Sequence, residues 1–252
     1  MPHARRGARN ADWIPPLLMR DVLAQCRLGA ATDHAFLHIA KTGGTSVGSL
    51  LSARREAGQA TPVRLRHQWT LKMADAALPP ATRLHFILRD PLERYASAFY
   101  SRWRKGYPAF DAEWTPAETR VFERFPDISS LFRAVISDKA AEREAAETAF
   151  RSIGHLRRGY AFYFGSPDRI DRLKARIGLV GTLENLDEFC AALFREVDGR
   201  SEPSGDIRPP HAHRAPSGQA KHDLDETELA ALRAAFGKEY AVYKSLQRLI
   251  NT

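Results

Sequence analysis

Short apolar runs recur along the chain, and each is too short to form a helix. They therefore predict buried strands, which we place at residues 34–40, 62–66, 83–88 and 179–183. The segments between them are predicted to be mainly helical. Strands that alternate with helices predict an α/β fold, in which helices cover both faces of a mainly parallel sheet.

Capping residues indicate where several helices begin. Asp90 precedes Pro91 and is followed by Glu93 three residues later, which predicts a helix from residue 91 to about residue 105. Thr115 begins a similar pattern. Caps and helix-forming composition predict further helices at residues 45–55, 139–150, 166–176, 185–197 and 225–250, the last with a weak point at Gly237.

The predicted elements fit one domain. Residues 1–32 are expected to be a basic lead-in that ends in a short helix, and residues 33–252 to be the domain itself. Residues 199–222 are rich in Gly, Pro, Ser and His and are predicted to form a long loop. A composition of 44% hydrophobic and 27% charged residues excludes a disordered or collagen-like protein.

The basic residues are unevenly distributed. The whole chain has a formal net charge of +8, but residues 1–110 hold 17 basic and 7 acidic side chains, a net of +10. The remaining residues hold 21 and 23, a net of −2. This excess indicates an anionic partner and places its binding site in the first part of the chain.

Targeting and redox signals are scarce. No stretch reaches the ~18 apolar residues that cross a bilayer, and the N-terminal residues do not resemble a secretory signal. The two cysteines, Cys26 and Cys190, form neither a disulfide framework nor a metal motif. The expected location is therefore the cytoplasm.

The first candidate site is a glycine loop between a predicted strand and a predicted helix. Consecutive glycines and a helix N-terminus present backbone N–H groups and partial positive charge, which favour a phosphate or sulfate. The lysine precedes the glycines, unlike the arrangement in nucleoside-triphosphate loops. The alternative is a tight turn capped by Thr45. The loop consists of Lys41, Thr42, Gly43, Gly44, Thr45 and Ser46.

The second candidate site begins at the end of the predicted strand 83–88. Arg89 follows this strand, where open α/β sheets bind ligands. Asp90, Arg94 and Ser97 fall on one face of the next predicted helix. Arg89 and Ser97 are the expected anion ligands, whereas Arg94 is expected to form an ordinary pair with Asp90.

These two segments, HIAKTGGTS and LRDPLERYASAFY, resemble the carbohydrate sulfotransferases that use 3′-phosphoadenosine 5′-phosphosulfate (PAPS). The likeness is to the uronyl, or heparan sulfate, 2-O-sulfotransferase-like branch and its bacterial members. In that family the lysine-glycine loop binds the 5′-phosphosulfate, and the Arg and Ser of the second motif bind the 3′-phosphate. The resemblance thus implies that the loop from Lys41 to Ser46 binds the phosphosulfate, and that Arg89 and Ser97 bind the 3′-phosphate.

The resemblance extends loosely over residues 34–250, including LVGTLENL and FGKEYAVYKSL. It implies a single domain with a P-loop-like, mainly parallel sheet. Ala40 replaces the Pro that usually precedes the lysine, and residues 199–222 match no pattern of the family.

The implied reaction moves the sulfuryl group of PAPS to a hydroxyl of a saccharide acceptor and leaves PAP (adenosine 3′,5′-bisphosphate). Lys41 would offset charge on the leaving phosphate without a metal ion. A base must also remove the acceptor proton. His67 is the candidate, because imidazole titrates near working pH and the branch has its base about twenty residues before the Arg. His155 is the alternative base.

The acceptor contacts are less constrained by the sequence. Trp69 is a candidate for stacking on a sugar ring. Five basic residues are candidates for contact with an acidic glycan, with a solvated surface position as the alternative for each: Arg102, Arg104, Lys105, Arg157 and Arg158.

Two other functions compete with sulfuryl transfer. A phosphoryl-transfer enzyme with a variant loop would need Mg²⁺ and a nucleoside triphosphate. A non-catalytic basic protein that binds nucleic acid would show a steep salt dependence. The sequence contains no recognisable nucleic-acid module, so no nucleic-acid partner is expected.

Overall fold

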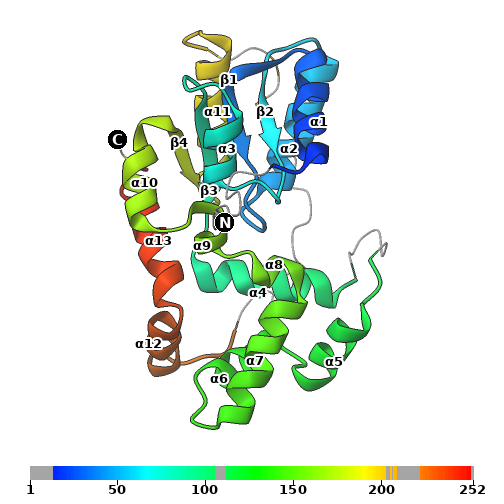
Figure 1. The fold of residues 1–252 in the computed structure, drawn as a ribbon, viewed down its shortest axis with the longest axis vertical. Coiled ribbons are helices and arrows are strands. Elements are labelled where there is room, and N and C mark those ends of the chain that lie inside the picture. The colour runs from blue at the N-terminus through cyan, green and yellow to red at the C-terminus, as the bar shows by residue number, and fades with distance from the viewer. Residues whose placement is uncertain (1–13, 106–111, 203–204, 206, 209–221, 251–252) are drawn as a thin grey trace, which may run out of the picture.

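The computed structural model describes residues 14–105, 112–202, 205, 207–208 and 222–250. Within them a four-stranded parallel sheet has the strand order β2-β1-β3-β4 (Figure 1). Its strands are β1 (Ala30–Leu37), β2 (Thr61–Leu65), β3 (Arg83–Leu88) and β4 (Ile177–Thr182). The α/β class and the parallel sheet predicted from the sequence are therefore confirmed.

Helices fill most of the remaining described chain. They are α1 (Pro16–Arg27), α2 (Gly44–Glu56), α3 (Leu71–Ala77), α4 (Pro91–Trp103), α5 (Pro116–Arg124), α6 (Ile128–Val135), α7 (Ala140–Ser152), α8 (Gly154–Arg157), α9 (Tyr160–Phe164), α10 (Pro167–Leu173), α11 (Leu186–Asp198), α12 (Glu226–Ala235) and α13 (Gly237–Gln247), with a 3-10 turn at Lys174–Arg176. No helix in the described ranges is both long and apolar enough to cross a membrane.

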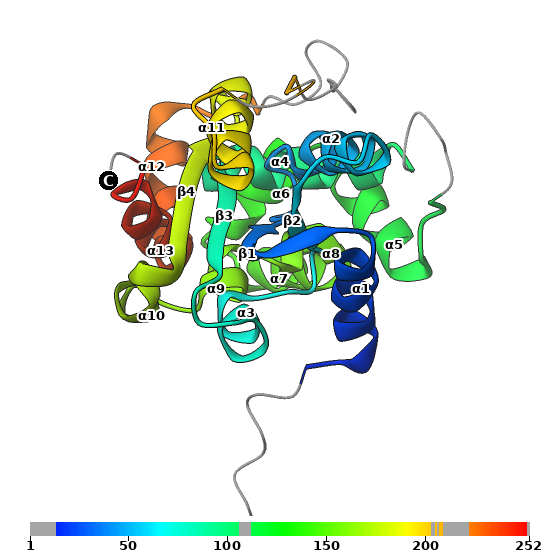
Figure 2. The same ribbon diagram turned by 90° about the horizontal axis from the view of Figure 1, so that it is seen from above.

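The two faces of the sheet have separate cores because successive side chains of a strand point in opposite directions. Phe36 packs with residues of α2 and α11, whereas its neighbour Leu37 packs with α1, α3, α9 and α13. Figure 2 shows α2 and α11 on one side of the sheet and α1, α3 and α10 on the other. Each fully buried Leu or Phe in these cores contributes about 1.5–3 kcal/mol.

A third core lies beyond one end of the sheet. Residues of α4 to α8, together with α12 and α13, pack there around Phe99, Phe132 and Leu232. In Figure 1 this helical layer lies below the sheet, and α4 leads into it directly from the end of β3. The ends of β1, β2 and β3 therefore face a second layer of protein, and the loops of the candidate site lie between the two.

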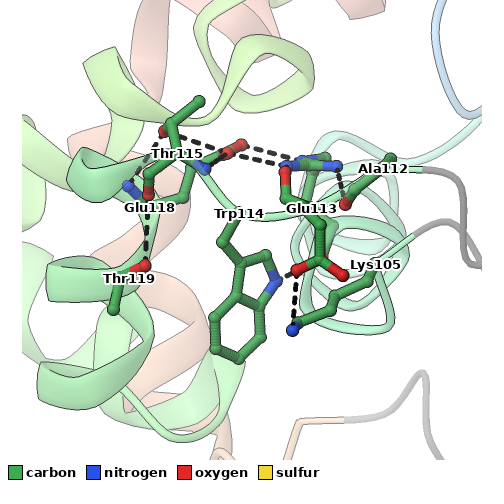
Figure 3. Close-up of polar contacts among 8 residues, drawn as sticks. Lys105, Ala112, Glu113, Trp114, Thr115, Glu118 and Thr119 are labelled. Atoms are coloured by element: carbon green, nitrogen blue, oxygen red, sulfur yellow. Dashed lines mark hydrogen bonds and ion pairs between the residues drawn. The ribbon is translucent and has the colours of Figure 1, made fainter.

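Most predicted boundaries agree with the structure. The Asp90 carboxylate accepts hydrogen bonds from the Leu92 and Glu93 amides and so caps α4. The reciprocal capping box of Thr115 and Glu118 begins α5 (Figure 3). The predicted break at Gly237 separates α12 from α13.

The first strand and the predicted loop differ from expectation. The strand expected at residues 34–40 spans Ala30–Leu37 instead, because Ala30 and Ala31 already pair with β2 before a register shift that leaves residues 32–34 without partners in β2. The predicted loop at 199–222 and the lead-in before residue 14 lie mostly outside the described residues. The predicted short helix in the lead-in is α1.

Candidate functional site

The glycine loop forms a tight turn between β1 and α2. Gly43 has a φ of 86°, which is left-handed backbone, and it precedes the first residue of α2. Lys41 also has a positive φ, 69°, which is strained for a residue with a side chain. The Thr42 hydroxyl donates to the Ile39 carbonyl at 3.0 Å and helps to hold the turn. Gly43 is thus the N-cap residue of α2. The loop is the tight turn of the alternative interpretation, but Thr45 does not cap it.

Glycine is required at two further positions because other side chains lie against the backbone. A Cβ on Gly44 would lie 1.9 Å from Cδ2 of His38, and one on Gly48 would lie 2.2 Å from Cζ of Arg64. The Arg64 guanidinium in turn donates to Nδ1 of His38 at 2.9 Å. The first turn of α2, with its unpaired amides, therefore lies beside a buried histidine and an arginine.

Lys41 lies in a strongly positive environment. Burial, followed by the charges of Arg104 and Arg89, lowers the pKa of its ammonium group from 10.5 to about 8. Among the described residues, neither Lys41 nor Arg104 forms an ion pair, and Nε and Nη1 of Arg104 are buried without a hydrogen-bond partner. Such a cluster of cations favours an anionic ligand, because its charge and hydrogen bonds would compensate for the hydration that the cations lose on burial.

Arg89 lies at the predicted position, directly after β3. Its side chain is 16% exposed, and Nε donates to the Glu93 carboxylate at 3.3 Å. Its charge also lowers the pKa of Lys41, so the structure brings the two predicted motifs close together. Ser97 is half-buried two turns along α4.

Arg94 departs from the expected pair with Asp90. Its guanidinium is fully buried, lies over the Tyr95 ring at 4.4 Å and donates to the His155 carbonyl at 3.3 Å. The Asp90 carboxylate instead accepts from the Tyr240 hydroxyl at 3.0 Å. Nε and Nη2 of Arg94 have no hydrogen-bond partner among the described residues. Its charge also lowers the pKa of His155, so a further buried cation lies close to this region.

His67 belongs to a cluster of three histidines. Its ring lies 4.0 Å from that of His38 and 5.4 Å from that of His155. Nδ1 of His67 lies 3.2 Å from the His38 carbonyl oxygen, so it is the protonated nitrogen and donates this bond. Burial is the main cause that lowers the pKa of His67 to about 4. The expectation that this imidazole titrates near working pH is therefore wrong. The ring is neutral at pH 7, and Nε2 holds a lone pair that can accept a proton.

His155 is close to the same group of residues. Burial is the main cause that lowers its pKa to about 3, and the charge of Lys41 and the neighbouring His67 contribute to this shift. Its Nδ1 is buried without a hydrogen-bond partner in the described chain. The structure thus places both candidate bases near Lys41, but only His67 has its tautomer fixed by a hydrogen bond from the ring.

The expected acceptor contacts are partly wrong. Trp69 is fully buried in the core and presents no face to a sugar. Arg102 is paired with Glu118 at 2.7 Å. Lys105 is paired with Glu113 at 2.8 Å (Figure 3). Their charges are therefore neutralised within the helical layer.

One group of residues has the composition of a metal site, at His34, His85 and Glu196, whose ligand atoms lie within 4.8 Å of one another. The Leu179 amide donates to Nδ1 of His85 at 3.0 Å, so Nε2 of a neutral His85 carries the proton. That nitrogen donates to Nδ1 of His34 at 3.0 Å. A metal ion would need the same nitrogen as a lone pair, so these residues fit a hydrogen-bonded chain and not a metal ligand set.

Sequence reasoning missed two tyrosines that contact the backbone of the site. The hydroxyl of Tyr160 binds the backbone of Arg89, and that of Tyr163 binds the amide of Ala40. Both belong to α9, which follows the helical layer in the chain. The aromatic run GYAFYF is visible in the sequence, but its spacing does not predict which distant backbone groups the tyrosines bind.

No protein-family model, curated protein or solved structure matches the chain. The functional interpretation therefore rests on the two sequence motifs and on the charge, burial and geometry of their residues.

Proposed function

We propose that the chain is a sulfotransferase, which moves the sulfuryl group of PAPS to a hydroxyl of a saccharide acceptor. The observation that carries the proposal is the partly buried cluster of Lys41, Arg89 and Arg104, in which Lys41 and Arg104 have no ion pair in the described chain. It lies beside the first turn of α2, whose backbone amides add donors for an anion.

PAPS suits this cluster because it carries two separated anionic groups. The loop from Lys41 to Ser46 would hold the phosphosulfate through its amides and hydroxyls, and Arg89 with Ser97 would hold the 3′-phosphate. The unpartnered guanidinium nitrogens of Arg104 and Arg94 support the fit, since buried donors without acceptors are rare in folded proteins.

The chemistry assigns a separate role to each group. When PAPS is bound, its sulfur–oxygen bond to phosphate breaks as the acceptor oxygen attacks the sulfur. The Lys41 ammonium, protonated below pH 8, offsets the negative charge on the leaving phosphate. Nε2 of His67 accepts the acceptor's proton, while its Nδ1–H remains bonded to the His38 carbonyl.

Ligand-dependent thermal unfolding tests the proposal against its competitors. The unfolding midpoint is measured with PAP, with ATP and with ATP plus Mg²⁺, because a ligand that binds only the native state raises the midpoint. We expect PAP to stabilise the chain without Mg²⁺, also at moderate salt. Stabilisation by ATP with Mg²⁺ but not by PAP would indicate phosphoryl transfer instead.

Transfer itself is measured by mass spectrometry of a mixture of glycans incubated with PAPS. A mass increase of one sulfuryl group on any glycan supports the proposal, and Lys41→Ala is the matched inactive control. If PAP does not bind while DNA or RNA binds with a steep salt dependence, the chain is a nucleic-acid-binding protein.

A further inference from the structure

Helix α9 lies where the two motifs of the site meet. It spans only Tyr160–Phe164, and Figure 1 shows it just beyond the sheet, between the sheet and the helical layer. Its two tyrosines are three residues apart, so their side chains leave the same side of the helix. Tyr160 and Tyr163 are both fully buried, yet each hydroxyl forms a hydrogen bond with a backbone far away in the sequence.

Tyr160 binds the backbone at the end of β3. Its hydroxyl accepts from the Arg89 amide at 2.9 Å and donates to the Arg89 carbonyl at 2.6 Å. One hydroxyl therefore satisfies both backbone groups of the residue whose side chain is the candidate ligand for the 3′-phosphate. This matters because Arg89 has left the sheet, where a neighbouring strand would otherwise pair with its backbone.

Tyr163 binds the backbone at the end of β1. Its hydroxyl accepts from the Ala40 amide at 3.2 Å, directly before Lys41. Lys41 has a positive φ, a conformation that costs of order 1–3 kcal/mol and persists only where its surroundings hold it. The Tyr163 bond lies on one side of this strained residue, and the Thr42 hydroxyl bond to the Ile39 carbonyl closes the same turn.

The helix that carries the two tyrosines is itself firmly held. The Glu239 carboxylate of α13 accepts from the amides of Tyr160 and Ala161, the second at 3.1 Å, and so caps α9. A Cβ on Gly159 would lie 2.3 Å from this carboxylate, which explains the glycine. The ring of Phe164 packs on Phe86 of β3 with 4.8 Å between centroids. The hydroxyls therefore have fixed positions relative to the sheet.

We propose that Tyr160 and Tyr163 are positioning residues that align the two anion-binding motifs independently. Tyr160 sets the backbone from which Arg89 reaches the 3′-phosphate, and Tyr163 sets the strained turn from which Lys41 reaches the 5′-phosphosulfate. The inference rests on the proposed function for the identity of the two anions. This role differs from ordinary core packing. The aromatic rings alone would fill the core, whereas the proposed role belongs to the hydroxyls and their hydrogen bonds to the backbone.

Binding of three nucleotides to Phe variants tests this division of labour. Isothermal titration calorimetry is carried out with PAP, with adenosine 3′-phosphate and with adenosine 5′-phosphate. Tyr160→Phe should weaken the two ligands that have a 3′-phosphate by about fivefold or more, and Tyr163→Phe the two that have a 5′-phosphate, since one hydrogen bond contributes about 1 kcal/mol. Each variant should leave the third nucleotide unchanged.

Tyr243→Phe is the matched control. Its ring lies 5.6 Å from that of Tyr160 in the same aromatic group, but its hydroxyl has no hydrogen bond among the described residues. It should bind all three nucleotides as the wild type does. Equal weakening of all three ligands by Tyr160→Phe and Tyr163→Phe, or no weakening by either, would overturn the inference.

Amide hydrogen exchange without ligand separates this inference from the proposed function. Tyr160→Phe should speed exchange at Arg89, and Tyr163→Phe at Ala40, by about fivefold or more. If the wild type binds none of the nucleotides, the proposed function is wrong. Amide exchange at Arg89 and Ala40 then still tests whether the two tyrosines position the backbone. If a variant does not fold, the same amides are measured in the wild type, where unprotected exchange at Arg89 and Ala40 would contradict the inference.

Discussion

Lys41 is a partly buried cation whose neighbours are also cations. Burial, Arg104 and Arg89 together lower its pKa from 10.5 to about 8. The native state therefore holds the protonated amine at a free-energy cost, and an anionic ligand would remove that cost. Residues of this kind reduce stability in exchange for binding, as is common at functional sites.

Lys41→Met should accordingly raise stability while it removes function. Below pH 8 the amine is protonated in both states and the penalty is fully present, up to about 3 kcal/mol for a pKa lowered from 10.5 to about 8. Between pH 8 and 10.5 the unfolded chain binds more protons, so the wild type gains stability as pH rises. Urea unfolding at pH 7 should show Lys41→Met as more stable, with no sulfuryl transfer.

Lys105→Met is the control for this substitution, because Lys105 is half-buried and paired with Glu113. It should not increase stability and should retain transfer. A Lys41→Met variant less stable than the wild type at pH 7 would contradict the penalty.

The same titration predicts how PAP binding depends on pH. Binding of an anion favours protonated Lys41, so affinity should be constant below pH 8 and fall by up to about tenfold per pH unit above it. Phosphate groups have their second pKa near 6 and remain fully charged in this range. Calorimetry from pH 7 to 9.5 checks this, and Lys41→Met should bind weakly with no such decline.

His67 and His155 compete for the role of base, and their substitution should separate them. His67→Ala should lower kcat by about 10²–10⁴-fold, the usual contribution of a general base, and leave PAP affinity nearly unchanged. His155→Ala should change kcat much less, because no hydrogen bond from its ring fixes its tautomer in the described structure. Steady-state kinetics with retained turnover in His67→Ala would eliminate His67 as the base.

Helix α2 can contact the end of β1 because Gly44, the first residue of the helix, has no side chain. A Cβ at Gly44 would overlap the His38 ring at 1.9 Å, and neither the strand end nor the helix can move without disturbing the turn at Lys41. Gly44→Ala should therefore destabilise the chain by about 1–3 kcal/mol, the usual cost of overpacking. It should also weaken PAP binding.

Gly154→Ala provides the comparison, because its Cβ would meet no atom within 4 Å and its φ is not in the left-handed region. It should unfold at the wild-type urea concentration. Equal stability of the Gly44→Ala and wild-type proteins would show that His38 moves aside at little cost.

Elements with local signals were predictable from the sequence. Asp90 and Thr115 mark the starts of α4 and α5 because their side chains satisfy amides two or three residues away. The strand–glycine–helix order at Gly43 predicted the turn because only a left-handed residue fits there. These features depend on neighbours within a few residues, which a single sequence contains.

Elements fixed by distant contacts were not predictable. Tyr163 and Ala40 are 123 residues apart, and Tyr160 and Arg89 are 71 apart, so no local pattern connects them. Trp69 was expected to be available to a sugar, but it packs in one core with residues of the sheet and of α9. These residues are distant in the sequence, so the sequence alone does not show the burial of Trp69. The proximity of His67 to His155 likewise depends on how the helical layer meets the sheet.

The site takes its charge from both layers of the molecule. Lys41, Arg64 and Arg89 come from the strand ends, whereas Arg94 and Arg104 belong to α4 or follow it in the helical layer. All five lie in the first 110 residues, which carry the basic excess of the chain. Five of the 17 basic residues in that segment therefore lie where the two layers of the molecule meet, together with the neutral histidines.

Neutral buried histidines make the whole molecule sensitive to acid. Burial is the main cause that lowers the pKa of His67 to about 4 and those of His85 and His155 to about 3. In the unfolded chain each titrates near 6.5. Between these values the unfolded state binds more protons, so stability is fully present above pH 6.5 and is lost as pH falls below it.

The predicted loss is large relative to the stability of a domain. At pH 5 each of the three histidines favours unfolding by about 2 kcal/mol, together about 6 kcal/mol against a usual total of 5–15 kcal/mol. Urea unfolding between pH 7 and 5 should show uptake of three protons or more. His85 lies away from the anion site, and His85→Gln removes its titrating group. This variant should therefore take up one proton fewer than the wild type on unfolding. A free energy of unfolding that stays constant over this range would contradict the prediction. It would mean that water reaches these histidines in the native state and that they are not buried.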